Sequence, residues 1–575
     1  MFKRKLLLQL QLRRLENKRP RTAPGGLWFT YTSRISFLFL SKQELLPYPS
    51  LRKILPMRYT ISLSIFIWIL ILPTTAFAQD DRPNIVFIMA DDMGWAQPGF
   101  NGGNKALTPN IDALAHEGMR LTQYYTHSVC APTRAAFLTG KYAFRTWSDW
   151  RTEDFGKPSY LAKLGLTLAH NNRGEPTRRI HGLDTEEYTI AEALKDAGYF
   201  TALIGKWHAG EWLPEHLPMG QGFMYQYGHY AWGIDYFQKT IEHNAPATFA
   251  VYDWHRNQKP VQEFGYSTDL FTKEVIKLIA NQANRSKTGH PFFLYVAYNA
   301  VHGPLNVPDR YKHMDARDAM LKALDDGVGE IVEALDVHGL RGNTLLVFTN
   351  DNGPVLEELS KPYRGTKNTT FEGGVRSPAI VRWPGRTKAG TKNDGMMFVA
   401  DWFSTFISVA HGSQKPNRKV DGLNMTGMLF DGKQSPRDEI FYDVSGSVRL
   451  PTIRKGDYKL MGGALYNIIN DPYETTDIAA KHPELVARLK SRLDAAGAER
   501  PPLGDKPLLM DPPLPYVYGM VENENPPQWL IDHVDAIRAT QPKQWAPGET
   551  PWPKAPVGAI ASKMTGGVDE RPVSK

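Results

Sequence analysis

The sequence has a single cysteine, Cys130, in 575 residues. One thiol cannot form an intramolecular disulfide, so the fold depends on its hydrophobic core for stability. With 42% apolar and 22% charged residues, the chain is long enough to bury a large core and a second, smaller unit. A lone cysteine is ordinarily a buried, inert thiol, and any other role for Cys130 has to come from its surroundings.

The chain also lacks a basic surface once its first residues are set aside. Its formal net charge is +8, but residues 1–78 alone hold thirteen Lys and Arg against two Glu. The other residues therefore carry a net charge of −3. Nucleic-acid binding is not expected from such a balance, and the sequence shows no internal repeats that would indicate an array.

Nor does the sequence contain an apolar run as long as the roughly 20 residues that a membrane-spanning helix needs. The apolar stretch at 61–72 is shorter. It follows Met57 and precedes the small-residue pattern Ala76-Phe77-Ala78. That order is typical of a signal peptide, so stable membrane insertion is not expected.

These features predict how the first part of the chain is processed. Translation would start at Met57, which makes residues 1–56 a spurious upstream extension, and residues 57–78 would be removed as a signal peptide. The mature protein would begin near Gln79. No cysteine follows the apolar stretch directly, so a lipid anchor is not expected. We predict an exported bacterial protein, periplasmic or secreted.

What the sequence does contain is an alternation of apolar, strand-like runs with helix-period segments, which is typical of an α/β sheet. The runs are 84–90, 201–205, 292–298 and 344–349. Between them, Thr189 and Glu192 form a capping box at the start of one helix. Another helix has an apolar face at helical spacing, formed by Leu321, Leu324, Val328, Ile331 and Leu335. We predict an α/β domain over residues 79–434.

The pattern changes after about residue 435. Short strand-like pieces precede a helical stretch at 482–497, which predicts a smaller antiparallel α+β subdomain over 435–500. Residues 501–575 hold 14 prolines and show little periodicity. We predict that this tail is extended chain on the surface or partly disordered.

Polar side chains follow each of the four strand-like runs. In chain order they are Asp91-Asp92, Lys206 with His208, His302, and Asp351-Asn352. Polar residues are common at strand ends, so one such set is weak evidence. In an α/β sheet, however, ligands bind outside the carboxyl ends of the strands. Four sets at such ends predict one shared site.

The carboxylates and the amide of this set offer only hard oxygen ligands. Asp91, Asp92, Asp351 and Asn352 suit Ca²⁺ or Mg²⁺ rather than zinc or copper. Solvated loop carboxylates would explain one isolated pair, but two pairs after two strands favour a metal. We predict one Ca²⁺, in preference to Mg²⁺, because its flexible coordination shell can also accept substrate oxygens.

Cys130 lies in the string SVCAPTRAAFLTGKY. Pro132 suits a first helical turn, which places Cys130 at a helix N-terminus. Backbone N–H groups at such an end bind a tetrahedral anion, and Arg134, one turn further on, would add a charge-assisted hydrogen bond. A thiolate nucleophile at the same helix end is the alternative.

The string Cys130-Ala131-Pro132-Thr133-Arg134, followed by LTG, closely resembles the sulfatase signature that formylglycine-forming enzymes read. The resemblance extends over most of residues 84–500, through ADDMGW, TPNIDALAHEG, GKWHAG, PFFLYVAYNAVHGP, TNDNGP, RGTKNTTFEGG and LYNIINDPYE. The chain is similar to formylglycine-dependent type I sulfatases of the alkaline phosphatase superfamily. The branch of arylsulfatase B, the N-acetylgalactosamine-4-sulfatase, is the nearest in resemblance, along with bacterial sulfatases of polysaccharides.

The resemblance implies a fold, a modification and a set of roles. The fold is a large mixed sheet flanked by helices, with a smaller C-terminal α+β subdomain. A maturation enzyme would oxidise Cys130 to formylglycine, and the modified residue would complete a calcium site formed by Asp91, Asp92, Asp351 and Asn352. One hydroxyl of the hydrated aldehyde would attack sulfur with Asp351 as base.

The remaining roles also follow from the resemblance. His302 and Lys367 would assist departure of the alcohol, and His208 would remove the proton from the second hydroxyl. Arg134, Lys206 and Lys367 would hold the charge that builds on the sulfate oxygens. The sequence departs from the family pattern at Thr133, where Ser is usual, at Gly303, which is often larger, and at Ala209, which replaces a common Leu.

The substrate implied is a sulfated carbohydrate or an aryl sulfate, and export favours the carbohydrate. Basic and aromatic residues, together with one aspartate, could form glycan subsites, or an ordinary surface loop over an aromatic cluster. They are Arg145, Arg151, Arg173, Arg178, Arg179, His181, His229, Tyr230, Trp232 and Asp235. Two other functions stay open: a phosphodiester or phosphonate monoester hydrolase of the same superfamily, and an inactive sulfoglycan-binding relative. The oligomeric state is not indicated.

Overall fold

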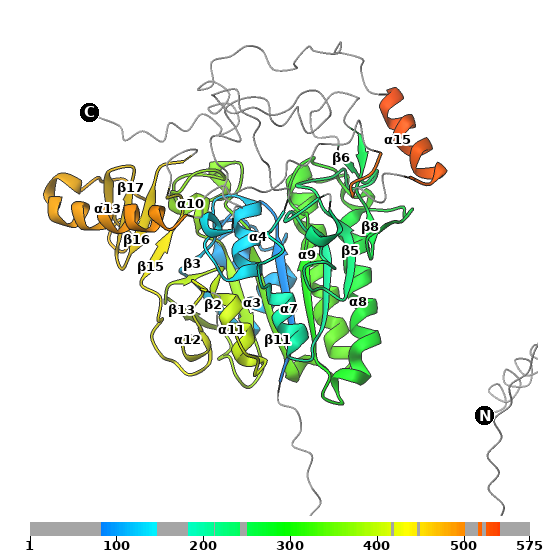
Figure 1. Cartoon of the computed structure of the whole chain (residues 1–575), viewed down its shortest axis with the longest axis horizontal. Helices are drawn as coiled ribbons and strands as arrows, with labels where there is room; N and C mark the ends of the chain where they lie inside the picture. Colours follow the sequence, from blue (N-terminus) through cyan, green and yellow to red (C-terminus); the bar gives the residue numbers. More distant parts are fainter. Residues whose placement is uncertain are drawn as a thin grey trace, which may run out of the picture. The chain divides into compact units, whose positions relative to one another are not determined.

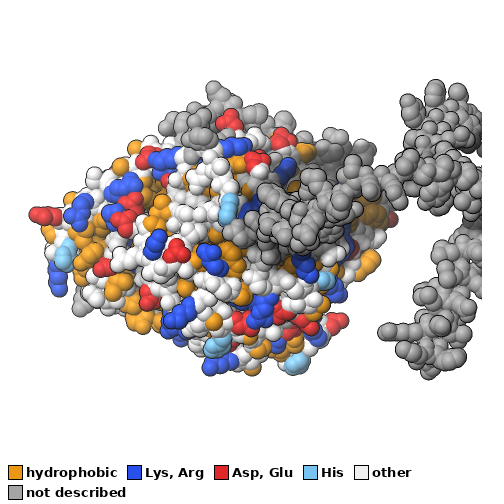
Figure 2. All heavy atoms as spheres, turned by 90° about the horizontal axis from the view of Figure 1, so that it is seen from below, with side chains coloured by type: hydrophobic (Ala, Val, Ile, Leu, Met, Phe, Trp, Pro, Cys, Tyr) orange, Lys and Arg blue, Asp and Glu red, His pale blue; other side chains and the backbone are white. Residues whose placement is uncertain are grey.

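The computed structural model describes residues 82–146, 182–211, 213–241, 250–415, 419–444, 449–500, 516–519 and 525–540. The predicted leader and residues 147–181 lie outside these ranges. Within them, no helix combines the length and the apolar character that a membrane crossing requires. Acidic and basic side chains are interspersed on the face drawn in Figure 2.

The centre of the molecule is a ten-stranded mixed sheet (Figure 1). Its strands, in spatial order, are β13 (Thr391–Asn393), β2 (Met119–Leu121), β12 (Ala379–Arg382), β11 (Thr344–Asn350), β1 (Asn84–Ala90), β10 (Phe292–Ala297), β4 (Phe200–Lys206), β5 (Tyr225–His229), β8 (His255–Arg256) and β9 (Lys259–Pro260). The five strands from β11 to β5 are parallel. Antiparallel pairing of β12 with β11 and of β8 with β5 makes the sheet mixed.

The central strand β1 is buried on both sides, as the uninterrupted apolar run predicts. Ile85, Phe87 and Met89 belong to one core cluster and Val86 and Ile88 to another. The first cluster includes residues of α4 (Cys130–Thr139), α7 (Ile190–Asp196) and α11 (Asp401–Val409). The second includes residues of α3 (Pro109–Glu117), α8 (Ser267–Ser286) and α9 (Ala316–Val337). Helices therefore cover both faces, and the predicted fold class is confirmed.

Local sequence signals position these helices. The predicted capping box is present at α7, where Thr189 accepts from the Glu192 N–H and Glu192 accepts from the Thr189 N–H. The predicted apolar face of α9 is buried in the core. Short elements complete the domain: the pair β3 (Tyr124–Tyr125) and β14 (Met397–Phe398), the pair β6 (Thr240–Ile241) and β7 (Val251–Tyr252), and the helices α10 (Glu372–Val375) and α12 (Thr426–Phe430).

The C-terminal subdomain contains a four-stranded antiparallel sheet. Its strands are β15 (Glu439–Phe441), β16 (Thr452–Lys455), β17 (Tyr458–Met461) and β18 (Ala464–Asn467). The helix α13 (Pro483–Ala498) packs on it through Leu489, Leu493 and Ala496. This unit lies at the left of Figure 1. The predicted change to short antiparallel strands followed by a helix is confirmed.

The prediction for the tail is wrong for residues 528–540. They form a helix, α15 (Gln528–Thr540), instead of extended chain. Leu530, Val534 and Ile537 have helical spacing and are buried in the core cluster that contains α8 and α9. The prediction relied on the high proline content of the whole tail, and this short amphipathic pattern does not show in that overall composition.

Candidate functional site

The candidate site lies at the carboxyl ends of neighbouring parallel strands. Asp91 directly follows β1 and Asp351 directly follows β11, and the two strands pair up to Ala90 and Asn350. Lys206 is the last residue of β4, which pairs with β10. Because these strand ends meet at one edge of the sheet, residues more than 100 positions apart become neighbours.

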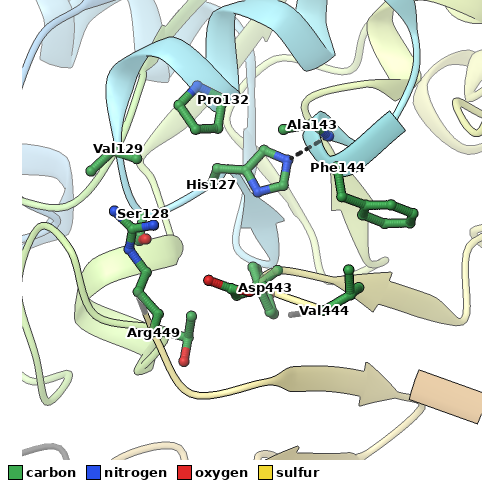
Figure 3. A pocket seen from close by; sticks show the side chains of 11 residues that line it. His127, Ser128, Val129, Pro132, Ala143, Phe144, Asp443, Val444 and Arg449 are labelled. Carbon is green, nitrogen blue, oxygen red and sulfur yellow. Dashed lines mark hydrogen bonds between the residues drawn. The ribbon is translucent and has the colours of Figure 1, made fainter. Parts of the chain in front are cut away.

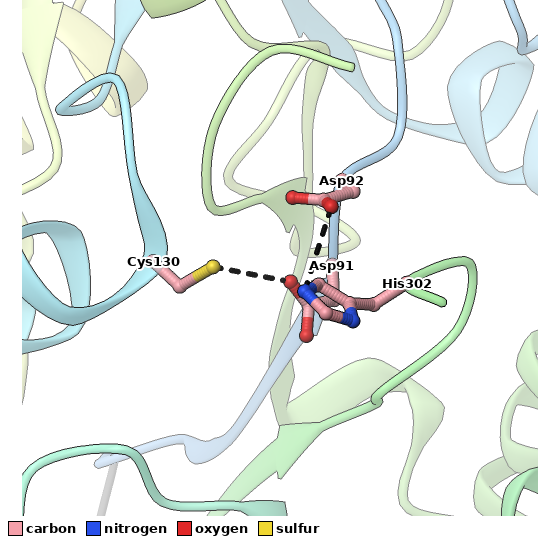
Figure 4. Close-up of side chains that lie close together, drawn as sticks. All are labelled: Asp91, Asp92, Cys130 and His302. Carbon is pink, nitrogen blue, oxygen red and sulfur yellow. Dashed lines mark hydrogen bonds and ion pairs between the residues drawn. The ribbon is translucent and has the colours of Figure 1, made fainter. Parts of the chain in front are cut away.

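Cys130 is the first residue of α4, as predicted, and its side chain faces Asp91 (Figure 4). Its Sγ lies 3.4 Å from Asp91 Oδ1, and the residue is 3% exposed. Burial, together with the nearby Asp351 carboxylate, raises the pKa of the Cys130 thiol. A thiol with a raised pKa is a poor nucleophile, which argues against the thiolate alternative.

The hydroxyl of Thr133 fixes the start of this helix. Thr133 Oγ1 accepts a hydrogen bond from the His127 N–H at 3.0 Å. The departure from the usual Ser therefore keeps the hydroxyl's contact with the preceding loop. A small cavity beside this helix end is lined by residues that include His127, Ser128 and Arg449 (Figure 3). Arg449 comes from the C-terminal subdomain, and its Nη2 donates to Asn368 Oδ1 at 2.9 Å.

Three cations and three carboxylates alternate around Cys130. Lys206 Nζ lies 2.5 Å from Asp91 Oδ2, Arg134 Nη2 2.8 Å from Asp351 Oδ2, and Lys367 Nζ 2.7 Å from Asp92 Oδ1. Asp91, Asp351, Arg134 and Lys206 have fully buried side chains. Buried charges are stable only when paired. The arrangement therefore holds three positive groups in place where an anion can approach.

Asn352 supplies the observation that tests a metal at this point. Its Nδ2 donates to Asp92 Oδ1 at 2.7 Å, while its buried Oδ1 has no hydrogen-bond partner. A buried acceptor without a donor is costly, unless a cation meets it. One oxygen of this kind beside three carboxylates is the donor set that Ca²⁺ or Mg²⁺ prefers. The ligand atoms of Asp91, Asp92, Cys130 and His302 also lie within 4.8 Å of one another.

The electrostatic environment shifts the pKa values of Asp351 and Asp92 in opposite directions. Burial and the neighbouring Asp91 raise the pKa of Asp351 to about 6. Burial opposes ionisation of Asp92 as well, but the Lys367 ammonium outweighs it and holds the pKa of Asp92 below its usual range. A carboxyl group that titrates near neutral pH is suited to accept a proton, and Asp351 is that group here.

His302 has a defined tautomer. Its Nδ1 lies 2.6 Å from the carbonyl oxygen of Gly303, which can only accept, so Nδ1 carries the proton. Nε2 therefore presents a lone pair and lies 3.7 Å from Asp92 Oδ2. Burial and the charge of Lys367 lower the pKa of His302 to about 3. The imidazole is neutral in this arrangement.

Three residues in or beside the site have a strained backbone. Asp92, His208 and Asn368 have φ angles of 59°, 54° and 72°, in the left-handed region that side-chain-bearing residues rarely adopt. Each is held by a hydrogen bond from its own N–H: Asp92 to Asp351 Oδ1 at 3.2 Å, His208 to the Tyr230 carbonyl at 2.9 Å and Asn368 to the Ser128 carbonyl at 2.9 Å. Strain of this kind clusters at functional sites.

The predicted subsite residues divide into different roles. Arg145 forms ion pairs with Asp421 and Glu499 and thus ties the main domain to the end of α13. His229 and Tyr230 are fully buried. Trp232 reaches the site, with its ring centroid 6.0 Å from that of His302. The five candidates between residues 151 and 181 lie outside the described residues.

Sequence reasoning missed two residues that support the site. Tyr295 Oη lies 3.5 Å from Arg134 Nη1 and belongs to β10, where it reads as one more apolar strand position. Asn350, the last residue of β11, accepts from the Met93 N–H at 2.9 Å and donates to the Met93 carbonyl at 2.8 Å. Its position directly before Asp351 is the signal that could have identified it.

A mixed α/β sheet, a helix N-terminus at its carboxyl edge and three cations paired with carboxylates, two of them fully buried, define a class: enzymes that act on esters of tetrahedral oxyanions. Comparison with known proteins identifies the member of this class. The family described as Sulfatase matches residues 83–413.

Named relatives agree with this match. N-acetylgalactosamine-6-sulfatase of Mus musculus is 33% identical over 400 residues, which are 66% of this chain and 71% of that protein. Arylsulfatase J of Mus musculus is 28% identical and covers 73% of this chain and 77% of its own length. The crystal structure of Ps i-CgsB in complex with k-i-k-neocarrahexaose is 29% identical, with a TM-score of 0.61 over 73% of this chain and 94% of that one.

The chain belongs to the sulfatase family, within the alkaline phosphatase superfamily, and is a sulfuric ester hydrolase. The predicted family, fold and reaction class are confirmed. The predicted proximity to the 4-sulfatase branch stays a prediction.

Proposed function

We propose that this enzyme removes sulfate from a sulfated carbohydrate outside the cytoplasm, with Cys130 converted to formylglycine and one calcium ion in the site. The observation that carries the proposal is the position of Cys130, at the first turn of α4 and 3.4 Å from Asp91 Oδ1. Two buried cations, Arg134 and Lys206, and the partly exposed Lys367 surround it. An ordinary buried cysteine packs as a small apolar side chain and is not expected to lie among charged groups.

A carbohydrate substrate is supported by two relatives. One is named N-acetylgalactosamine-6-sulfatase, and the other forms a crystallised complex with k-i-k-neocarrahexaose. The predicted signal peptide at 57–78 adds to this, because an exported enzyme meets polymeric extracellular substrates. We therefore favour a sulfated glycan over a small aryl sulfate as the natural substrate.

The oxygen ligands fit calcium. Asp91, Asp92, Asp351 and the unpartnered Asn352 Oδ1 would hold the ion together with the modified Cys130. When bound, it supplies positive charge opposite the sulfate oxygens. Mg²⁺ is the less favoured choice, because it keeps a rigid octahedral shell and holds its waters.

The residues of the chain then have separate tasks. Arg134, Lys206 and Lys367 hold the sulfate group. Asp351, with its raised pKa, takes a proton from one hydroxyl of the hydrated aldehyde, and that oxygen displaces the alcohol at sulfur. Lys367 carries a proton for the departing oxygen, and His302 donates one from Nε2 once the negative charge of the bound sulfate group has raised the pKa of the ring.

The second step explains why an aldehyde is used. His208 takes the proton from the second hydroxyl, the C–O bond to sulfate breaks, and the carbonyl forms again. A serine sulfate would instead need a second attack at sulfur. Each cycle consumes one water, which hydrates the aldehyde, and releases one alcohol and one sulfate.

A panel of defined sulfated oligosaccharides tests the substrate class. We expect sulfate release from at least one of them with a kcat/KM above that for 4-nitrophenyl sulfate, because remote sugar contacts contribute binding energy. Paired rates on an aryl phosphate diester and an aryl phosphonate should be far lower. A phosphonate rate above every sulfate rate would favour the alternative hydrolase. Binding of the oligosaccharides without sulfate release would favour the inactive relative.

A further inference from the structure

Residues 229–236 form a segment that contacts both histidines of the proposed mechanism, and we name it the histidine-bracing loop. The Tyr230 carbonyl accepts from the His208 N–H at 2.9 Å. At the other end of the loop, Tyr236 Oη shares its proton between the His302 carbonyl, at 2.8 Å, and the Asn299 carbonyl. One segment therefore fixes the backbone of two residues that are 94 positions apart in the sequence.

The middle of the loop lies against the His302 ring. The Trp232 ring centroid is 6.0 Å from the His302 centroid. A Cβ atom added at Gly233 would stand 3.3 Å from both Cε1 and Nδ1 of His302, closer than most side-chain contacts. The loop thus sets the ring position of His302 as well as its backbone.

Asp253 anchors the start of this loop. It lies between β7 and β8, and it is fully buried. One carboxylate oxygen accepts from the Tyr230 N–H at 2.9 Å and the other from the Ala231 N–H at 2.8 Å. The first oxygen is also 3.1 Å from His255 Nε2. Each oxygen therefore holds one backbone N–H of the loop.

We propose that Asp253 is a positioning residue for the sulfatase reaction, acting through the histidine-bracing loop on His302 and His208. This inference rests on the proposed function, which gives the two histidines their roles. Asp253 itself contacts no reacting group. Its two acceptor oxygens are what the loop requires, since an amide in its place offers one acceptor and turns an N–H donor toward the second N–H.

The leaving group of the substrate provides a readout that a merely structural role would not move. A nitrophenolate departs without a proton, whereas a sugar alkoxide depends on assistance from His302 and Lys367. A displaced His302 therefore penalises sugar sulfates selectively. For Asp253→Asn we expect kcat on a sulfated oligosaccharide to fall about tenfold or more, and kcat on 4-nitrophenyl sulfate to fall only about two- to threefold. KM should change less than about twofold, because Arg134, Lys206 and Lys367 stay in place.

Asp325→Asn is the matched control. Asp325 is equally buried and accepts from the Ile111 N–H and from Asn110 Nδ2, both at 2.8 Å, so it anchors the start of α3 in the same manner. Its loss should lower the melting temperature while leaving the ratio of the two rates unchanged. Gly233→Ala is the second test, since its methyl group presses on the His302 ring without removing any hydrogen bond, and it should shift the ratio in the same direction.

The outcomes are distinct. Failure of the unsubstituted enzyme to hydrolyse either sulfate would refute the proposed function. If it hydrolyses both, equal losses on the two substrates in Asp253→Asn would reduce Asp253 to a structural residue and overturn the inference. If Asp253→Asn fails to fold, Gly233→Ala decides instead. An unchanged ratio of its kcat values on the sulfated oligosaccharide and on 4-nitrophenyl sulfate would also overturn the inference.

Discussion

In the part of the chain that the structure describes, two buried clusters of charged side chains resemble each other in composition. The catalytic cluster consists of Asp91, Asp92, Asp351, Arg134, Lys206 and Lys367. The second, which we call the interdomain cluster, consists of Glu372, Glu474, Lys459, Arg376 and Arg454, where the main domain meets the C-terminal subdomain. Only the first has the features of a site.

The two clusters differ in whether their polar atoms are all paired within the protein. In the interdomain cluster, Glu372 accepts from Tyr125 Oη at 2.8 Å, Lys459 Nζ at 3.1 Å and Arg376 Nη1 at 3.2 Å. Glu474 accepts from the Glu372 N–H at 2.7 Å and pairs with Lys459 at 2.8 Å. The donors are thus directed at the carboxylates inside the protein, and the Glu372, Glu474 and Lys459 side chains are fully buried.

The catalytic cluster is built differently at its edge. Asn352 Oδ1 has no donor, and the Lys367 and His302 side chains keep 15% and 10% exposure. Buried charge alone therefore does not indicate a site. What indicates a site is the unpartnered acceptor, Asn352 Oδ1, together with the partly exposed side chains of Lys367 and His302.

The largest effect that separates the two clusters should come from metal removal. Chelation should lower activity by about three orders of magnitude or more, because the positive charge of the metal ion beside the sulfate oxygens is lost. Calcium should restore activity better than zinc, since the ligands are oxygens. The melting temperature should also fall by about several degrees on chelation, as expected when an ion bound to the native state is removed.

Asp92→Asn provides the variant for this test, with Glu372→Gln as its control. The first should lose bound calcium by elemental analysis and lose activity. The second changes the interdomain cluster and should retain both the ion and the specific activity of folded enzyme. Full activity in excess chelator, with no metal in the protein, would remove the metal from this account.

A smaller effect should reveal the interdomain cluster through the pH dependence of stability. Burial, opposed by Lys459, raises the pKa of Glu474 to about 7 from 4.5. The folded state then binds more protons than the unfolded state between these values, so the free energy of unfolding falls as pH rises from about 5 to about 7. Glu474→Gln removes this titration. The difference in unfolding free energy, variant minus unsubstituted protein, should grow by about 1–3 kcal/mol between pH 5 and pH 8.

Urea unfolding at several pH values measures that difference. Asp309→Asn, which removes an exposed pair with Lys312, serves as control and should leave the profile unchanged. A Glu474→Gln profile parallel to that of the unsubstituted protein would show that Glu474 stays ionised in the fold, held by Lys459.

Much of the catalytic cluster could be predicted from the sequence because its members follow strands. Asp91, Lys206 and Asp351 each come directly at or after the end of a buried apolar run, and parallel strand ends share one edge of a sheet. Cys130 was placed by Pro132 and the adjoining string. The motifs indicate which residues carry the chemistry, and the strand ends explain why they meet.

The interdomain cluster could not be predicted in this way. Glu372, Lys459 and Glu474 lie in three separate segments. Glu372 and Glu474 belong to two of the strings that carry the family resemblance, but those strings do not indicate that the two carboxylates meet, and no strand end relates them to Lys459. Asp253 was missed for the same reason, because its partners Tyr230 and Ala231 are reached only through the packing of β8 against β5. Contacts between elements depend on tertiary packing, which local patterns do not encode.

The central claim is that Cys130 acts as formylglycine, and peptide mass spectrometry of active enzyme tests it most directly. Preparations with different degrees of conversion should show activity in proportion to the fraction of Cys130 found as formylglycine or its hydrate. Cys130→Ala should be inactive, with a melting temperature within about a few degrees of the unsubstituted enzyme. Undiminished turnover by Cys130→Ala, or by enzyme whose Cys130 is wholly an unmodified thiol, would contradict the account and move the nucleophile elsewhere.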